Sequence, residues 1–178
     1  RALTGVNALR RETWLRPLIQ SWVETNSRLI QSIATQYVDQ VAQRTQDMVR
    51  SGAGLREYVS ELTRVYGVTQ KRARLIARTE VAKLNGQITR ARQMRAGLIE
   101  YEWMTSADER VRDSHRVLNG MICDWSDPTV FREPGSALWR RRSEIGAVIG
   151  IPGGAVNCRC VAGARVDEFL NNLLGEAA

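Results

Sequence analysis

The chain has 178 residues, of which 43% are hydrophobic and 25% are charged. This balance is ordinary for a folded domain and excludes a chain that is disordered throughout. No apolar run approaches the roughly 18 residues that a membrane-spanning helix needs, and the start of the chain lacks the pattern of a secretory signal peptide. We therefore expect a globular intracellular protein that does not contact a membrane.

The net charge of +7 is unevenly distributed along the chain. Residues 1–98 carry 17 Arg and Lys against 7 Asp and Glu, whereas residues 99–178 carry 9 against 12. A strongly basic segment is expected to meet a polyanion or an acidic protein surface. The two parts of the chain are thus predicted to have different functions.

Helical periodicity covers most of the first part. Apolar residues three or four apart predict a long helix over residues 17–49, a shorter helix over 55–65 and a third helix over 69–96. Gly67 and Gly97 follow the second and third helices, at the position where glycine is favoured after a helix C-terminus. These glycines predict where the two helices end.

The third helix has a basic face that we select as the candidate DNA-binding surface. Its residues are Lys71, Arg74, Arg78 and Arg92. Such a face is either solvated or contacts the phosphates of a nucleic acid without reading its sequence. Glu80 lies at the edge of the apolar stripe of the same helix, so we expect it to be half-buried and paired with an arginine.

After Gly97 the period of the apolar residues changes. Alternation predicts one half-buried strand over residues 98–105 and a second over 155–162, which together would form a small antiparallel sheet. A short helix, capped by Asp108, is predicted through about residue 118, and a closing helix over 166–174. The expected fold is α+β, with long N-terminal helices followed by a small antiparallel sheet, short helices and loops.

The only histidine and all three cysteines of the chain lie in its second part. These are His115, Cys123, Cys158 and Cys160. An odd number of cysteines excludes a complete disulfide framework, and cysteine and histidine are the usual ligands of zinc. On the predicted strand, Cys158 and Cys160 point to the same face. A structural zinc site built from these four residues is therefore one interpretation.

Two other interpretations of this group stay open. The thiols can be buried without a metal, beside a histidine that is hydrogen-bonded to Asp108 or Asp113. Alternatively, His115 can act as a general acid or base, with arginines that hold a phosphate. The sequence contains no paired carboxylates, glycine-rich phosphate loop or nucleophile elbow that would favour this enzymatic interpretation.

Several motifs in order resemble one family. They are Arg78-Thr79-Glu80 with Asn85, a strand ending in Trp103, Asp108-x-Arg110-Val111-Arg112-x-x-His115-x-x-Leu118-Asn119-Gly120, and Pro152 with Asn157-Cys158-Arg159-Cys160. This order is similar to the phage Mu F-like head-morphogenesis proteins, which are minor capsid proteins of tailed phages and prophages. The resemblance covers about residues 70–165.

The resemblance also marks structural motif residues and two departures. The motif residues are Glu80, Asp108, Arg110, Arg112, Asn157 and Arg159. Where the family usually has Arg-Thr-Arg, this chain has Arg110-Val111-Arg112. Cys123 is not a family position, so its role as a fourth metal ligand rests on this sequence alone.

The resemblance implies a Mu F-like domain over residues 69–178. Residues 1–68 match no motif of the family, but their helical and basic character predicts an arm upstream of that domain. It implies a non-enzymatic minor head protein that is present in several copies in the phage head interior and is assembled in the host cytoplasm. The expected partners are the portal, other capsid proteins and DNA bound without sequence specificity, and zinc is the one cofactor considered. The alternatives are a His115-dependent nuclease-like or nucleotidyl enzyme, or a module that docks its first helix on a partner.

Overall fold

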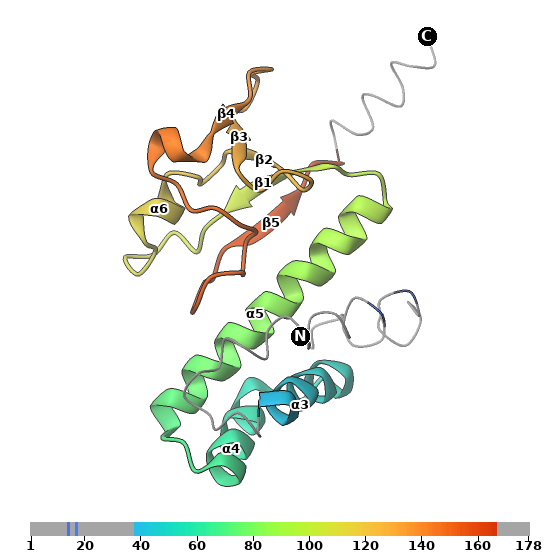
Figure 1. Cartoon of the computed structure of the whole chain (residues 1–178), viewed down its shortest axis with the longest axis vertical. Helices are drawn as coiled ribbons and strands as arrows, with labels where there is room; N and C mark the ends of the chain where they lie inside the picture. Colours follow the sequence, from blue (N-terminus) through green and yellow to red (C-terminus); the bar gives the residue numbers. More distant parts are fainter. Residues whose placement is uncertain (1–13, 15–16, 18–37, 167–178) are drawn as a thin grey trace. The chain divides into compact units, whose positions relative to one another are not determined.

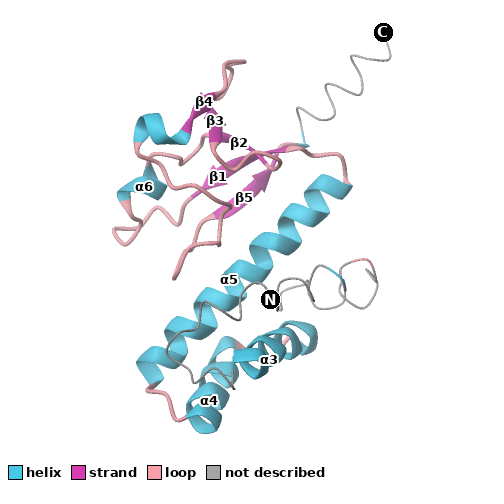
Figure 2. Cartoon of the chain, viewed as in Figure 1, coloured by secondary structure: helices cyan, strands magenta, loops and turns pink. Residues whose placement is uncertain are grey.

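The computed structural model describes Trp14, Pro17 and residues 38–166. The chain divides into two compact units after Leu84, inside a long helix. The fold is α+β, as predicted: helices make up the first unit, and the second contains the strands (Figure 2). The boundary predicted after residue 68 falls between two helices of the first unit.

Three helices lead into the strands (Figure 1). They are α3 (Val38–Ser51), α4 (Leu55–Tyr66) and α5 (Gln70–Arg95). The helix predicted over 17–49 is thus described as a continuous segment only from Val38, and the closing helix predicted over 166–174 lies outside the described residues beyond Val166. Among the residues that the structure describes, no helix combines the length and apolar character needed to cross a membrane.

The ends of α4 and α5 confirm the sequence prediction. Gly67 adopts a left-handed conformation with φ +63°, and its N–H donates to the Thr63 carbonyl at 3.2 Å. Thr69 caps α5 by accepting the Arg72 N–H on Oγ1 at 3.3 Å. Gly97 follows α5 with φ +81°. Each of these residue types satisfies backbone groups that a helix end leaves unpaired.

The first unit has its own apolar core between α3, α4 and the first part of α5. The core residues are Val41, Tyr58, Val59, Leu62, Ala73, Ile76 and Ala77. Tyr58 is fully enclosed, and its hydroxyl is hydrogen-bonded to Thr45 Oγ1 and to the Val41 carbonyl. Burial of this phenol is compatible with folding because its polar end finds partners on α3.

Glu80 is more deeply buried than the sequence predicted, and its partner is different. Its exposed fraction is 3%, and its Oε1 accepts a hydrogen bond from Lys83 Nζ at 3.0 Å. The predicted arginine partner is therefore wrong. Lys83 can pair with Glu80 because it is three residues further along α5, so that the two side chains lie next to each other on the helix.

The second unit is built on a five-stranded antiparallel sheet. Its strand order is β4-β3-β2-β1-β5. The strands are β1 (Glu100–Met104), β2 (Ile122–Asp124), β3 (Val130–Arg132), β4 (Arg140–Arg141) and β5 (Val161–Ala164). The predicted antiparallel pairing of the first and last strands is confirmed, with Tyr101 opposite Ala164 and Trp103 opposite Ala162.

Three strands were missed because each is too short to show alternation. β2 and β3 have three residues and β4 has two. Alternation of apolar and polar residues can be recognised only over at least four residues. Hydrogen bonds to a neighbouring strand can define a shorter strand. β1 was predicted correctly, although Ile99 just before it is 59% exposed and not part of the buried face.

Two other predicted elements are shorter than expected. The strand predicted over 155–162 begins only at Val161, so Cys158 and Cys160 lie in the loop before β5. The helix predicted from Asp108 is reduced to α6 (Asp113–Arg116). Asp108 instead closes a turn, in which its Oδ1 accepts the Arg110 N–H at 3.0 Å. Local hydrogen bonding by aspartate competes with helix formation in this way.

The core of the second unit is rich in aromatic residues. It includes Tyr101, Trp103, Leu118, Cys123, Trp125, Phe131, Cys158 and Cys160. The rings of Tyr101 and Trp125 lie 3.9 Å apart. Gln93, near the end of α5, accepts the Trp125 indole N–H at 2.9 Å and donates to the Ala162 carbonyl at 3.4 Å. This one side chain connects α5 to two separate parts of the sheet region.

A buried arginine completes this core. Arg142, with an exposed fraction of 0%, begins the 3-10 helix η3 (Arg142–Ile145). Its guanidinium donates to three carbonyls, those of Val130, Val148 and Gly150, and to the Tyr101 hydroxyl. It also lies 5.2 Å from the centre of the Trp103 ring. The charge is thus satisfied by carbonyl oxygens and an aromatic face.

Gly86 allows a loop to approach α5 closely. A Cβ atom at this position would lie 2.4 Å from the Pro152 carbonyl oxygen. Glycine inside a helix costs about 1 kcal/mol relative to alanine, so its presence needs a packing reason. The approach of the Pro152 loop supplies that reason, and this loop leads directly to Cys158.

Candidate metal centre

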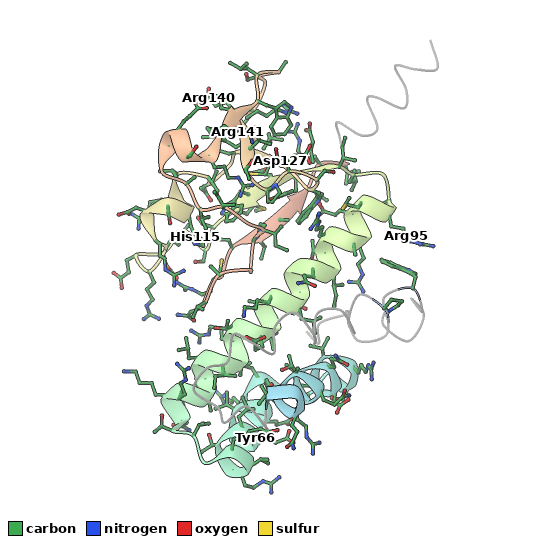
Figure 3. All side chains as sticks on the ribbon, in the orientation of Figure 1. Tyr66, Arg95, His115, Asp127, Arg140 and Arg141 are labelled. Carbon is green, nitrogen blue, oxygen red and sulfur yellow. The ribbon has the colours of Figure 1, made fainter. Side chains whose placement is uncertain are left out.

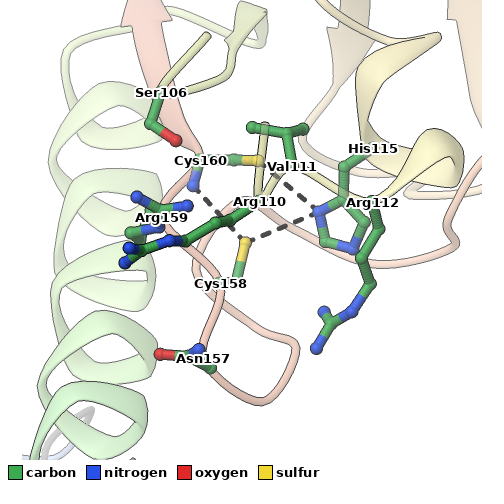
Figure 4. Close-up of a pocket in the computed structure, with 9 residues that line it drawn as sticks. All are labelled: Ser106, Arg110, Val111, Arg112, His115, Asn157, Cys158, Arg159 and Cys160. Atoms are coloured by element: carbon green, nitrogen blue, oxygen red, sulfur yellow. Dashed lines mark hydrogen bonds between the residues drawn. The ribbon is translucent and has the colours of Figure 1, made fainter. Parts of the chain in front are cut away.

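His115, Cys158 and Cys160 meet in the second unit (Figure 4). His115 Nδ1 lies 3.6 Å from Cys158 Sγ and 3.5 Å from Cys160 Sγ. All three side chains are buried, with exposed fractions of 4 to 6%. The three ligand atoms lie within 4.8 Å of one another. The structure therefore brings together three of the four residues selected as metal ligands.

Cys123 is not a member of this group. It lies on β2, opposite Tyr101 in the register of the sheet, and is fully buried in the aromatic core. Burial raises the pKa of the Cys123 thiol. Its expected role as a fourth ligand is wrong because the strand order places it in the ladder beside β1, whereas Cys158 and Cys160 lie in the loop before β5.

Short local structures hold the three side chains. His115 points from α6 into the second unit (Figure 3), and its ring meets that of Trp103 edge-on at 5.9 Å. A turn positions Cys158, whose N–H donates to the Ala155 carbonyl at 3.1 Å. Asn157 occupies this turn with φ +54°, a conformation that asparagine tolerates better than most residues. This explains why an asparagine precedes the first cysteine.

The predicted motif residues surround the same group. Asp108 and Arg159 form a two-pronged ion pair, in which Nη2 donates to Oδ1 at 2.6 Å and Nη1 donates to Oδ2. Arg112 donates to the Val156 carbonyl at 2.9 Å. Both contacts join the segment before α6 to the cysteine loop, across more than forty residues of sequence. These contacts fix the position of the segment that carries His115 relative to the loop that carries Cys158 and Cys160.

The electrostatic state of the two thiols is coupled. The hydrogen bond from the Cys160 thiol lowers the pKa of Cys158 to about 5, and His115 acts in the same direction. The same contact raises the pKa of Cys160. In addition, the Cys160 backbone N–H lies 3.4 Å from Cys158 Sγ. These contacts favour the thiolate form at Cys158 over the thiolate form at Cys160.

A cavity of about 60 Å³ opens beside these residues. Its lining residues are Ser106, Arg110, Val111, Arg112, His115, Asn157, Cys158, Arg159 and Cys160. Three arginines and no carboxylate contribute to this lining. The open part of the cavity therefore suits a small anion or a water molecule.

The predicted DNA-binding residues are only partly brought together. Lys71, Arg74 and Arg78 are exposed on α5, as predicted. Arg74 and Arg78 line a groove of about 770 Å³ in the first unit. Arg92 belongs to the second unit, is half-buried and interacts within the chain. It does not line this groove.

The sequence analysis missed the other side of the groove. Arg56 and Arg64 of α4 line it together with Arg74 and Arg78 of α5. The two α4 arginines are eight residues apart, which places them near one face of a helix, so the signal was present. The sequence does not show that these α4 arginines line the same groove as the basic face of α5.

The aromatic core, the histidine–cysteine group and the helical first unit define an α+β module without a membrane-spanning helix among its described residues. Residues 39–163 match the family described as phage Mu protein F like protein. The chain belongs to this family, which is one of phage-head-related proteins.

One curated relative adds to this comparison. An uncharacterized protein of Haemophilus influenzae (strain ATCC 51907 / DSM 11121 / KW20 / Rd) is 30% identical over 161 residues. The match covers 89% of this chain and 32% of the relative, so the chain spans about a third of the length of that protein. No solved structure matches the chain.

Proposed function

We propose that this protein is a minor head protein of a tailed phage or prophage. In this role it is present in several copies inside the head, is assembled in the host cytoplasm and contacts the portal and other capsid proteins. The observation that carries the proposal is the family match over residues 39–163, which spans both compact units. The proposed role is non-enzymatic, in keeping with the match to a family of phage-head-related proteins.

A second part of the proposal concerns DNA. The groove between α4 and α5 is lined by four arginines and by no acidic residue. Arg56, Arg64, Arg74 and Arg78 are all exposed, and their guanidinium groups form no ion pair with another described residue. Exposed arginines gathered on one surface can neutralise phosphates without reading base sequence. We assign this groove to the backbone of the packaged DNA.

The head proposal is tested in assembled particles. Phage or prophage particles carrying the tagged protein are purified and treated with a short amine-reactive or carboxyl-reactive cross-linker. We expect the protein to co-purify with heads and to form cross-links to the portal. Particles that package DNA normally and contain none of the protein would contradict the proposal.

The DNA proposal is tested with purified protein and a duplex of random sequence. We expect the affinity to fall steeply with salt concentration, because each neutralised phosphate contributes a slope of about −0.9 in log K against log salt. The double variant Arg74→Glu/Arg78→Glu should bind more weakly and show a shallower slope. Arg50→Glu is compared with the single variant Arg74→Glu, which changes the net charge by the same amount, because Arg50 is exposed on α3 and does not line the groove.

Two results would redirect the DNA proposal. If the wild-type protein does not retain duplex DNA at low salt, the groove more closely suits an acidic protein surface. If Arg50→Glu weakens binding as much as Arg74→Glu does, the interaction reports net charge and not a defined surface.

A further inference from the structure

The contacts around His115 cannot all be hydrogen bonds. Nδ1 of an imidazole offers either one N–H or one lone pair in the ring plane. Here the same atom lies 3.5 Å from Cys160 Sγ and 3.6 Å from Cys158 Sγ (Figure 4). A hydrogen bond to one sulfur leaves the other at contact distance without a partner on the ring. A shared cation between the three atoms accounts for both nitrogen–sulfur contacts at once.

The distances agree with such a cation. Zinc binds imidazole nitrogen at about 2.0–2.1 Å and thiolate sulfur at about 2.3 Å, so tetrahedral coordination separates nitrogen from sulfur by roughly 3.6 Å. Both nitrogen–sulfur distances in the structure match this value. Two thiolates and an imidazole select a soft or borderline ion such as zinc over calcium or magnesium, which prefer oxygen.

We propose that His115 Nδ1, Cys158 Sγ and Cys160 Sγ bind one zinc ion, whose fourth coordination position faces the arginine-lined cavity. No other cysteine, histidine or carboxylate among the described residues joins the group. We assign the fourth position to an oxygen ligand in the cavity, supplied by water or by an oxyanion. Two thiolates balance the charge of Zn²⁺, and the arginines of the cavity add net positive charge around the open position.

Surrounding contacts support this coordination. The Cys160 N–H, 3.4 Å from Cys158 Sγ, donates to the sulfur that would carry negative charge. The Asp108–Arg159 ion pair and the Arg112 contact with Val156 fix the loop that presents both cysteines. Among the arginines of the cavity, Arg110 has an exposed side chain, which interacts electrostatically with the nearby Asp108 carboxylate. It is the one placed to contact an oxyanion on the metal.

Metal content is the first test. The 178-residue chain is purified without added metal, incubated with zinc, separated from free metal and analysed by elemental analysis. We expect about one equivalent in the wild-type protein and in Cys123→Ser, and less than about a tenth in Cys158→Ser, Cys160→Ser and His115→Ala. Cys123→Ser is the matched control because it removes a buried thiol that lies outside the group. Less than a tenth of an equivalent in the wild type would overturn the proposal.

Cobalt substitution of the wild-type protein covers the case in which the ligand variants do not fold. Cobalt bound by two thiolates in a tetrahedral site gives a thiolate-to-metal charge-transfer band and intense visible bands. Inorganic phosphate should change the visible bands if the fourth position is open, and this change should be reduced in Arg110→Ala. Visible bands of octahedral character, or no charge-transfer band, would overturn the assignment of the ligands.

Visible bands that phosphate does not change would overturn the open position while leaving the three ligands in place. These outcomes are independent of the proposed head function, because a chain without metal can still be incorporated into particles.

Discussion

The two units of this protein use arginine in opposite ways. In the first unit the arginines of α4 and α5 line an open groove and face the solvent. In the second unit Arg142 is fully buried, Arg132 is 2.6 Å from Glu100, and Arg159 pairs with Asp108. The same side chain thus provides a surface charge in one unit and a cross-link between segments in the other. The difference follows from how far the backbone of each unit satisfies its own hydrogen-bonding groups.

The first unit contains helices, whose backbone groups are satisfied within each helix. Its arginines are therefore not needed inside. The second unit has short strands and long loops, which leave carbonyl oxygens unpaired in its interior. Arginine carries five N–H donors in a fixed fork, so one buried guanidinium can satisfy several carbonyls at once. Arg142 does this for three carbonyls and a tyrosine hydroxyl.

Removing Arg142 tests this comparison most severely. Arg142→Met leaves three carbonyls and the Tyr101 hydroxyl without their donor, and we expect a loss of about 3–5 kcal/mol in the free energy of unfolding. Urea unfolding followed by tryptophan fluorescence measures the loss. The neighbouring variant Arg141→Ala is the control, because Arg141 is exposed and its ion pair with Asp127 spans 3.6 Å (labelled in Figure 3). If Arg141→Ala lowers the free energy of unfolding by more than about 1 kcal/mol, or if Arg142→Met leaves it unchanged, the proposed difference between the two units is wrong.

Lys83 and Glu80 are the exception within the first unit, because this pair is buried. Lys83→Met leaves the Glu80 carboxylate without its partner, and we expect a loss of about 3 kcal/mol in the free energy of unfolding near neutral pH. Glu80→Gln/Lys83→Met, which removes both charges, should recover part of this loss. Urea unfolding of both variants measures it. Equal losses in the single and the double variant would show that packing, and not the unpaired charge, decides the effect.

The pH dependence of the same variant supplies a second check. Burial raises the pKa of Glu80 above its usual value, while Lys83 acts in the opposite direction. Because the folded pKa lies above the unfolded value, the contribution of Glu80 is fully present below the unfolded pKa and is lost as pH rises through the folded pKa. The loss caused by Lys83→Met should therefore shrink as the pH is lowered and Glu80 takes up a proton. A loss that stays constant with pH would contradict the assigned cause.

Gly86 tests how closely the second unit is packed on its part of α5. Gly86→Ala places a Cβ atom against the Pro152 carbonyl oxygen, and we expect a loss of about 1–3 kcal/mol although alanine is the better helix former. Thermal or urea unfolding measures it. Gly54→Ala is the control, because no atom lies within 4 Å of the added Cβ and φ is −71°. A stabilised Gly86→Ala variant would show that the Pro152 loop is free to move away.

The Asp108–Arg159 ion pair has the smallest expected effect, because both side chains are partly exposed. Hydrogen bonds from Arg159 hold the pKa of Asp108 below its usual value. Its stabilising contribution is therefore present above the unfolded pKa of about 3.9 and is lost as pH falls through the folded pKa. We expect Asp108→Asn to be less stable than the wild type at pH 6, with a difference that narrows below about pH 4.

The control for this variant is Asp113→Asn, because the Asp113 side chain is 96% exposed and its ion pair with Arg116 is long, at 3.8 Å. We expect its stability to stay within about 0.5 kcal/mol of the wild type. A difference between Asp108→Asn and the wild type that does not narrow on acidification would indicate a packing role for Asp108 in place of an electrostatic one.

Local rules determined α4, α5 and β1 from the sequence. Gly67, Thr69 and Gly97 fix helix ends through backbone hydrogen bonds within a few residues, so their effect can be read without knowing the fold. The alternation of Tyr101 and Trp103 with glutamates likewise predicted β1. Residue type alone selected His115, Cys123, Cys158 and Cys160, of which the structure brings together all but Cys123.

Tertiary structure decided what depends on distant partners. β2, β3 and β4 exist because neighbouring strands pair with them, and their two or three residues carry no periodic signal. Strand order decides that Cys123 lies apart from His115, Cys158 and Cys160. The burial of Arg142 depends on which carbonyl oxygens the loops leave without a backbone partner. The sequence determined which side chains are available for chemistry, and the long-range pairing of the sheet decided which of them meet, because their separation along the chain carries no information about that contact.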